Sequence, residues 1–153
     1  MKSIVIYYSE TGNTEKVAKA IAVNLGADLK RIEEIKIDDV SKYDLICLGT
    51  PVHAFAPAKI VRRFLKELPN LPSKKGAAFC TMHAFGDKRT FKVIKESFEA
   101  KGISFIDGFS CIGLSRLVGN FGPRIFNRGR PSKKDLKNAE SFGKNILNSI
   151  KNH

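Results

Sequence analysis

The 153-residue chain contains no tryptophan, only two methionines and three cysteines, and few acidic residues. No apolar stretch approaches the roughly 20 residues that a membrane-spanning helix needs. The run from Ile4 to Tyr7 near the N-terminus is also too short for the core of a secretory signal. We therefore expect no membrane span, and a cytoplasmic location is the default expectation.

The cysteines are too few and too widely spaced to form a disulfide framework. The chain has an odd number of cysteines, namely Cys47, Cys80 and Cys111, and no two of them form a CxxC motif. Cysteine without a bonding partner behaves as a small apolar residue. We expect all three to lie inside strands, in preference to a role in disulfides or metal ligation.

Acidic residues are scarce relative to basic ones: 15 Asp and Glu stand against 27 Lys and Arg, giving a net charge of +12. Such a balance can indicate an anionic partner or serve solubility. The bias is strongest in residues 113–134, which contain six basic residues and no acidic one. No nucleic-acid-binding fold and no interleaved aromatic residues accompany the charge, so we expect no nucleic-acid partner.

Strand-like and helix-like segments alternate along the whole chain. The expected strands are 3–8, 27–35, 43–49, 76–82 and 103–113, and the expected helices are 14–25, 60–68, 88–101 and the segment from Pro131 to Ile150. The second strand is more polar than the others, as an edge strand would be. Right-handed crossovers between such segments predict an α/β fold with a doubly wound, mostly parallel sheet.

No repeat or linker divides the chain, so we expect a single domain over residues 1–153. The connection over 113–131 is long for a structureless loop inside a compact domain. It is therefore expected either to be functional or to contain a short helix.

The stretch SETGNT, residues 9–14, lies between the first expected strand and the first expected helix. That position is the carboxyl edge of the sheet, where open α/β sheets bind ligands. A helix N-terminus offers backbone N–H groups and a dipole that favour an anion, and glycine allows a tight turn. Side-chain donors come from Ser9, Thr11, Asn13 and Thr14. The stretch predicts a phosphate site; the alternative is a polar loop that only caps the helix.

The same stretch has no lysine, and the chain has neither GxxxxGK[ST] nor GxGxxG at this position. A P-loop NTPase needs the lysine and a metal to stabilise the charge that moves in phosphoryl transfer. The absence of these motifs argues against an NTPase and a dinucleotide site. The site is expected to hold a phosphate rather than to transfer one.

Two further stretches follow strands at the same edge, namely TPVHAFAP (50–57) and TMHAFG (81–86). Each offers a hydroxyl, an imidazole and a phenyl ring, and the two rings, Phe55 and Phe85, could enclose a flat ligand ring. The alternative is that both rings pack under their loops. Two histidines without a neighbouring carboxylate or thiolate do not predict a metal site.

Together these stretches make the chain resemble a short-chain flavodoxin over residues 1–151. SETGNT matches the family's Ser/Thr-x-Thr-Gly-Asn-Thr phosphate signature, and GTPVHAFAP and TMHAFG fall at the positions of its two ring-binding loops. The resemblance implies a three-layer flavodoxin-like sandwich with a five-stranded parallel sheet of strand order 2-1-3-4-5. It also implies non-covalently bound FMN and electron transfer between redox partner proteins, with no catalytic side chain.

The resemblance assigns site residues by position. The phosphate would be bound by Ser9, Glu10, Thr11, Gly12, Asn13 and Thr14, and the isoalloxazine ring would be enclosed by Thr50, Pro51, Val52, His53, Ala54, Phe55, Thr81, Met82, His83, Ala84, Phe85 and Gly86. The chain departs from the family in its lack of tryptophan and in its positive charge. The charge favours an acidic redox partner, such as a ferredoxin or a reductase, or an anionic substrate, binding at residues 113–134; the alternative is that this segment is a solvated loop.

Electron transport is the first functional hypothesis. The second is an FMN-dependent oxidoreductase acting on a small substrate such as a quinone, a porphyrin precursor or NAD(P)H. In that case the substrate would be bound by His53, His83, Arg116, Arg124, Arg128 or Arg130. The third is a flavin-free interaction module with the same fold.

Overall fold

A computed structural model describes residues 1–113, 115–119, 122–126 and 129–152, and for 115–126 it describes only the backbone of two strands. In chain order the elements are β1 (Ser3–Tyr7), α1 (Asn13–Leu25), β2 (Asp28–Arg31), a 3-10 helix (Ile37–Lys42), β3 (Leu45–His53), β4 (Ala56–Pro57), α2 (Lys59–Glu67), β5 (Lys75–Met82), α3 (Asp87–Glu99), β6 (Ser104–Ile112), β7 (Ser115–Gly119), β8 (Gly122–Phe126) and α4 (Lys133–Lys151).

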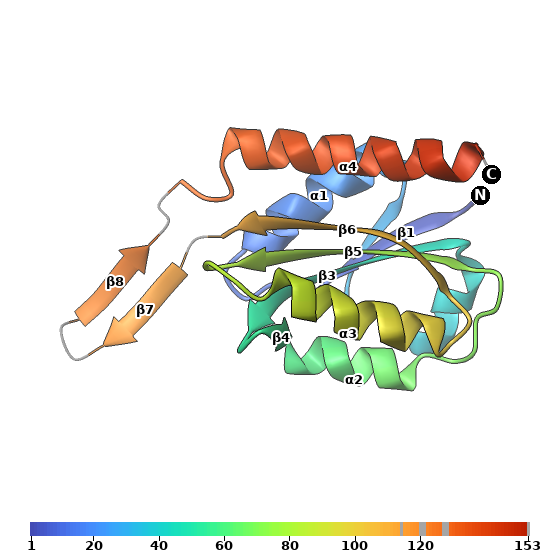
Figure 1. The fold of residues 1–153 in the computed structure, drawn as a ribbon, viewed down its shortest axis with the longest axis horizontal. Coiled ribbons are helices and arrows are strands. Elements are labelled where there is room, and N and C mark those ends of the chain that lie inside the picture. The colour runs from blue at the N-terminus through green and yellow to red at the C-terminus, as the bar shows by residue number, and fades with distance from the viewer. Residues whose placement is uncertain (114, 120–121, 127–128, 153) are drawn as a thin grey trace.

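Five parallel strands form the central sheet in the order β2-β1-β3-β5-β6. This is the predicted order 2-1-3-4-5, which is thereby confirmed. The short strand β4 pairs antiparallel with the end of β3 and was not expected. Helices α1 and α4 cover one face of the sheet and α2 and α3 the other, giving three layers (Figure 1). No helix in the described part of the chain has both the length and the apolar character needed to cross a membrane.

The central strands are buried on both faces because helices cover both. All five residues of β1 are buried, and adjacent residues point to opposite sides: Ile4 packs toward α2 and α3, and Val5 toward α1 and α4. Strand β2, by contrast, alternates exposed and half-buried residues at the edge of the sheet. The prediction that the polar second strand lies at an edge is confirmed.

All three cysteines are buried in strands and carry free thiols. Burial raises the pKa of Cys47 and Cys80 well above the usual range of a thiol and raises the pKa of Cys111 to about 12. A thiol that does not ionise is neither a nucleophile nor a metal ligand. The expectation of small apolar residues inside strands is confirmed.

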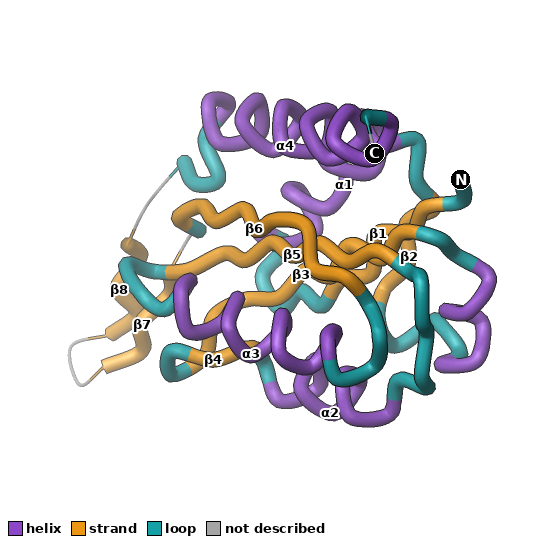
Figure 2. The backbone as a smooth tube through the Cα atoms, turned by 45° about the vertical axis from the view of Figure 1, so that its right-hand side comes forward, coloured by secondary structure: helices purple, strands orange, loops and turns teal. Residues whose placement is uncertain are grey.

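The connection after β6 contains a β-hairpin in its described residues, so of the two alternatives expected for it, a functional segment or a short helix, the second is wrong. Strands β7 and β8 pair antiparallel from Ser115↔Phe126 to Gly119↔Gly122 and project beyond the carboxyl ends of the sheet (Figures 1 and 2). Glycine and Pro123 disfavour a helix. The side chains of Arg116, Arg124 and Arg128, which the substrate and docking hypotheses invoke, lie outside the described residues.

Thr90 in α3 is fully buried, and its hydroxyl has no hydrogen-bond partner among the described residues. A buried polar group without a partner costs about 1–3 kcal/mol. The isosteric substitution Thr90→Val is therefore expected to raise the free energy of unfolding by about 1 kcal/mol, measured by urea denaturation. The matched control is Thr81→Val, which removes a buried hydroxyl that lies 2.8 Å from the Thr14 hydroxyl and should be destabilising. A loss of stability in Thr90→Val would show that its hydroxyl has a favourable partner after all.

Candidate functional site

The carboxyl ends of β1, β3, β5 and β6 meet around a cavity of about 140 Å³. Its lining residues are Glu10, Thr11, Asn13, Thr14, Pro51, Val52, His53, Thr81, Met82, His83 and Gly113. Ten of these eleven belong to the three stretches singled out in the sequence. The fold therefore brings the predicted phosphate stretch and the two predicted ring stretches to one place.

The first stretch leaves open space at the start of α1. Gly12 is the N-cap residue, with φ 87°, and no side chain caps the helix. The Ser9 hydroxyl accepts a hydrogen bond from the Gly12 N–H (3.1 Å), which closes the turn one residue before the helix. A Cβ at Gly12 would have nothing within 4 Å. An uncapped helix end beside open space suits an anion, whereas a loop that served only as a cap would supply a side-chain acceptor.

Thr14 joins the first stretch to the end of β5. Its hydroxyl lies 2.8 Å from that of Thr81, and both residues are buried. Asn13 lies close to Gly113, the residue that follows β6: a Cβ added at Gly113 would lie only 2.9 Å from Asn13 Nδ2. The sequence analysis missed Gly113. A glycine directly after a strand is the available signal, but its closeness to Asn13 arises only because the end of β6 approaches the first residue of α1.

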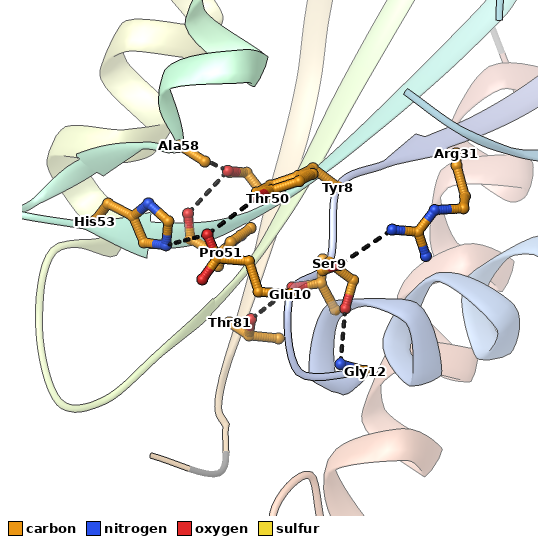
Figure 3. Close-up of polar contacts among 11 residues, drawn as sticks. Tyr8, Ser9, Glu10, Gly12, Arg31, Thr50, Pro51, His53, Ala58 and Thr81 are labelled. Atoms are coloured by element: carbon orange, nitrogen blue, oxygen red, sulfur yellow. Dashed lines mark hydrogen bonds and ion pairs between the residues drawn. The ribbon is translucent and has the colours of Figure 1, made fainter. Parts of the chain in front are cut away.

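Arg31 is a second residue that the sequence analysis missed. The parallel pairing of β1 with β2 places it opposite Tyr7, and its Nη2 donates a hydrogen bond to the Ser9 carbonyl oxygen (3.2 Å; Figure 3). The same Nη2 lies 3.5 Å from Glu33 Oε1. The Arg31 guanidinium on strand β2 therefore holds the backbone of the phosphate stretch by a hydrogen bond, although the stretch itself contains no basic residue.

The second stretch is a hairpin rather than a plain loop, because β3 continues to His53, past the predicted strand end at Gly49. His53 pairs with Ala56, and the two residues between them, Ala54 and Phe55, have φ of 48° and 63°. Positive φ at both central residues is the type I′ turn, which Asn and Gly favour and which is strained for Ala and Phe. Backbone strain of this kind tends to be kept at functional sites.

Ala54→Gly is expected to raise the free energy of unfolding of the FMN-free protein by up to about 1 kcal/mol, because glycine adopts positive φ without strain. The matched control is Ala56→Gly in β4, which has no positive φ and should lose stability. Thermal unfolding of both variants tests this. Equal losses of stability would mean that the turn carries no strain.

Thr50 fixes the base of this hairpin. Its hydroxyl donates to the Pro51 carbonyl oxygen (2.8 Å) and accepts from the Ala58 N–H (3.0 Å), and the residue is fully buried. Thr50 does not line the cavity. The hydrogen bonds of the Thr50 hydroxyl thus go to the backbone of its own stretch.

Phe55 and Phe85 lie in the two ring stretches with exposed fractions of 57% and 77% for the whole residue. The alternative that they pack under their loops is wrong. Neither lines the cavity, and Ala54 and Ala84 beside them are also exposed. The two stretches nevertheless touch: a Cβ at Gly86 would lie 2.7 Å from Val52 Cγ1 and 3.0 Å from Phe55 Cα.

Glu10 connects the first stretch to the second. Its Oε1 accepts a hydrogen bond from the Tyr8 hydroxyl (3.1 Å) and lies 3.5 Å from His53 Nε2 (Figure 3). Partial burial and the Glu10 hydrogen bond raise the pKa of Tyr8, so that its hydroxyl keeps its proton. Within the described residues, no three His, Cys, Asp or Glu side chains gather closely enough to hold a metal ion.

Comparison with known proteins identifies the family. Residues 4–116 match the flavodoxin domain family. An uncharacterized protein of Methanocaldococcus jannaschii is 30% identical over 154 residues, covering 96% of this chain and 99% of that protein. The flavodoxin of Megasphaera elsdenii is 32% identical over 110 residues, covering 67% of this chain and 80% of that protein. The solved structure of a flavodoxin from the domain Archaea has a TM-score of 0.80 at 22% identity and covers 99% of both chains.

The family match covers well over half of the chain, and flavodoxins bind FMN. The residues present suit that cofactor. The start of α1, which no side chain caps, suits its phosphate, and the cavity lined by all three stretches offers space beside that helix end. This chain belongs to the flavodoxin family of FMN-binding electron-transfer flavoproteins.

Proposed function

We propose that this chain carries electrons between redox partner proteins by means of non-covalently bound FMN. The supporting observation is the convergence of the three stretches on one cavity. In this proposal the phosphate is held by Ser9, Glu10, Thr11, Gly12, Asn13 and Thr14. The ring is enclosed by the two stretches Thr50, Pro51, Val52, His53, Ala54, Phe55 and Thr81, Met82, His83, Ala84, Phe85, Gly86. Of these residues, the ones that line the cavity are Pro51, Val52, His53, Thr81, Met82 and His83.

Within this proposal the side chains position the cofactor and do not act as acids, bases or nucleophiles. Bound FMN supplies the redox chemistry. The first turn of α1 orients the phosphate, and the Thr14–Thr81 contact holds that turn against the end of β5. The Glu10–His53 pair closes the cavity on the side of α2.

The partner is proposed to be an acidic protein. Exposed Lys88 and Arg89 lie in the first turn of α3, directly after the second ring stretch, whereas Lys92 in the next turn lies 3.8 Å from Glu96. The acidic residue of the first turn, Asp87, accepts a hydrogen bond from the Ser110 hydroxyl (3.0 Å). The net charge of +12 points in the same direction. Charge complementarity of this kind speeds the encounter with an acidic partner.

The decisive experiment is to purify the protein, titrate it with FMN and then add NADPH. We expect one FMN per chain, rapid reduction of the holoprotein by a reductase, and no steady NADPH oxidation without one. Steady oxidation by the holoprotein alone would instead support the FMN-dependent oxidoreductase. A protein that takes up no FMN would support the flavin-free interaction module.

The partner proposal has its own test. Electron transfer with an acidic ferredoxin should slow as salt rises to physiological strength, where the screening length is about 8 Å. The double variant Lys88→Gln/Arg89→Gln should slow the reaction at low salt. The matched control is Lys95→Gln, on the same helix but paired with Glu99 (3.9 Å), which should change the rate little. A rate that depends on neither salt nor these charges would refute docking on α3.

A further inference from the structure

A second pocket, of about 380 Å³, lies next to the FMN cavity on the side of α2. Its lining residues are Tyr8, Glu10, His53, Ala58, Lys59, Ile60 and Arg63. Glu10 and His53 line both spaces, and their side chains face each other at 3.5 Å (Figure 3); we name this pair the Glu10–His53 wall. The pocket therefore adjoins the FMN cavity and extends from it toward α2.

The acidic group in the pocket is already engaged. Glu10 Oε1 accepts the Tyr8 hydroxyl at 3.1 Å and lies 3.5 Å from His53 Nε2. These two contacts hold the carboxylate in the wall. A cationic ligand would have to compete with both of them for the same oxygen.

The cations in the pocket remain available. Lys59 is exposed and forms no ion pair with any residue that the structure describes. Arg63 Nε donates to Glu67 Oε1 (2.8 Å), but a guanidinium has five N–H donors, and one such bond leaves the others for a ligand. Two basic side chains beside one engaged carboxylate favour an anionic ligand.

The rest of the pocket is apolar and partly aromatic. Ile60 and Ala58 contribute aliphatic surface, and Tyr8 contributes a ring whose hydroxyl is tied to Glu10. Ligand pockets typically measure about 300–1,000 Å³ and combine apolar walls with a few polar groups. A volume of about 380 Å³ is enough for one or two fused aromatic rings with a small substituent.

We propose that this pocket binds a small aromatic acid, with its carboxylate against Lys59 and Arg63 and its ring against Tyr8 and Ile60. The site lies on the α2 side of the Glu10–His53 wall. It goes beyond the electron-carrier proposal and does not depend on it, because none of its features requires FMN.

The test compares 2-naphthoate with its uncharged analogue 2-naphthamide on the ¹⁵N-labelled protein, with and without FMN. We expect 2-naphthoate to bind one per chain, to shift the amide signals of Tyr8 and of residues 58–63, and to bind about tenfold more tightly than the amide. Saturation with FMN should leave this affinity unchanged. Equal binding of the two compounds, shifts confined to other regions, or loss of binding on FMN saturation would each overturn the proposal.

Two variants of α2 test whether the Lys59 charge binds the carboxylate. Lys59→Gln should weaken 2-naphthoate binding about tenfold and leave 2-naphthamide binding unchanged. The matched control is Arg62→Gln, which removes an exposed charge from the same helix outside the pocket and should have little effect. If both variants weakened 2-naphthoate binding equally, the binding would reflect only general charge attraction, and the proposed pocket would be refuted. FMN titration of the same samples reports separately on the electron-carrier proposal.

Discussion

Replacing Gly12 by valine is expected to weaken FMN binding about 100-fold while leaving the fold intact. A 100-fold loss corresponds to about 2.7 kcal/mol. Gly12 has φ 87°, which a β-branched residue adopts only at a cost of about 1–3 kcal/mol, so the variant also loses stability, but this strain is not what weakens FMN binding. Sequence reasoning alone would attribute the effect to crowding within the protein, but a Cβ at Gly12 meets no atom within 4 Å. The added side chain instead occupies the open space proposed for the phosphate.

Gly26→Val is the matched control for this experiment. Gly26 caps the other end of α1 with φ 62°, and a Cβ there also meets nothing within 4 Å. Both variants should lose similar stability in urea denaturation, because both strain a left-handed residue. Only Gly12→Val should weaken FMN binding in a fluorescence titration. Unchanged affinity in Gly12→Val would mean that the phosphate stretch has been misassigned.

Gly49→Ala is expected to lower the free energy of unfolding by about 3 kcal/mol, which is the upper end of the usual cost of adding a carbon atom to a well-packed core. Gly49 in β3 pairs directly with Phe79 in β5. A Cβ at this position would lie 2.0, 2.4 and 2.7 Å from three atoms of the Phe79 ring, which is fully buried in the core facing α1 and α4. The ring has no free space to move into, because protein interiors are close-packed.

The smaller side chain in Gly49→Ala/Phe79→Leu should recover part of the lost stability, since it removes the clashing ring atoms. Phe79→Leu alone should be destabilising, so the two substitutions are expected to be strongly non-additive. Denaturant titrations of the two single variants and the double variant measure this coupling. A cost below about 1 kcal/mol for Gly49→Ala would show that the Phe79 ring can shift.

The fold could be predicted from the sequence because its signals are local. Apolar runs such as that of β1 mark strands buried on both faces, and the polar composition of 27–35 marks an edge. Helical spacing and Gly26 fixed α1 to within one residue of its observed start. The strand order 2-1-3-4-5 was implied by the resemblance to short-chain flavodoxins, because the handedness of crossovers alone does not fix which strands are neighbours. Strand limits were less predictable: β3 runs four residues beyond Gly49, because its hydrogen bonding continues with β4 and β5.

The phosphate and ring stretches could also be located from the sequence, since each follows a strand that must end at the same edge of a parallel sheet. Their side-chain contacts could not. Arg31 reaches Ser9 only because β2 pairs with β1 in a particular register, and Thr14 meets Thr81 across 67 positions of sequence. The Glu10–His53 wall, and the pocket behind it, likewise join residues from different strand ends.

The sequence by itself thus determined the class of fold and the three stretches that form the site, and its resemblance to short-chain flavodoxins supplied the order of the strands. Periodicity, glycine and proline positions and turn chemistry act over a few residues, so they can be recognised without knowing any partner. The tertiary structure alone decided which side chains in those stretches meet each other, which face the cavity and which remain exposed. Those outcomes depend on strand register and on packing between distant segments, and the local sequence encodes neither.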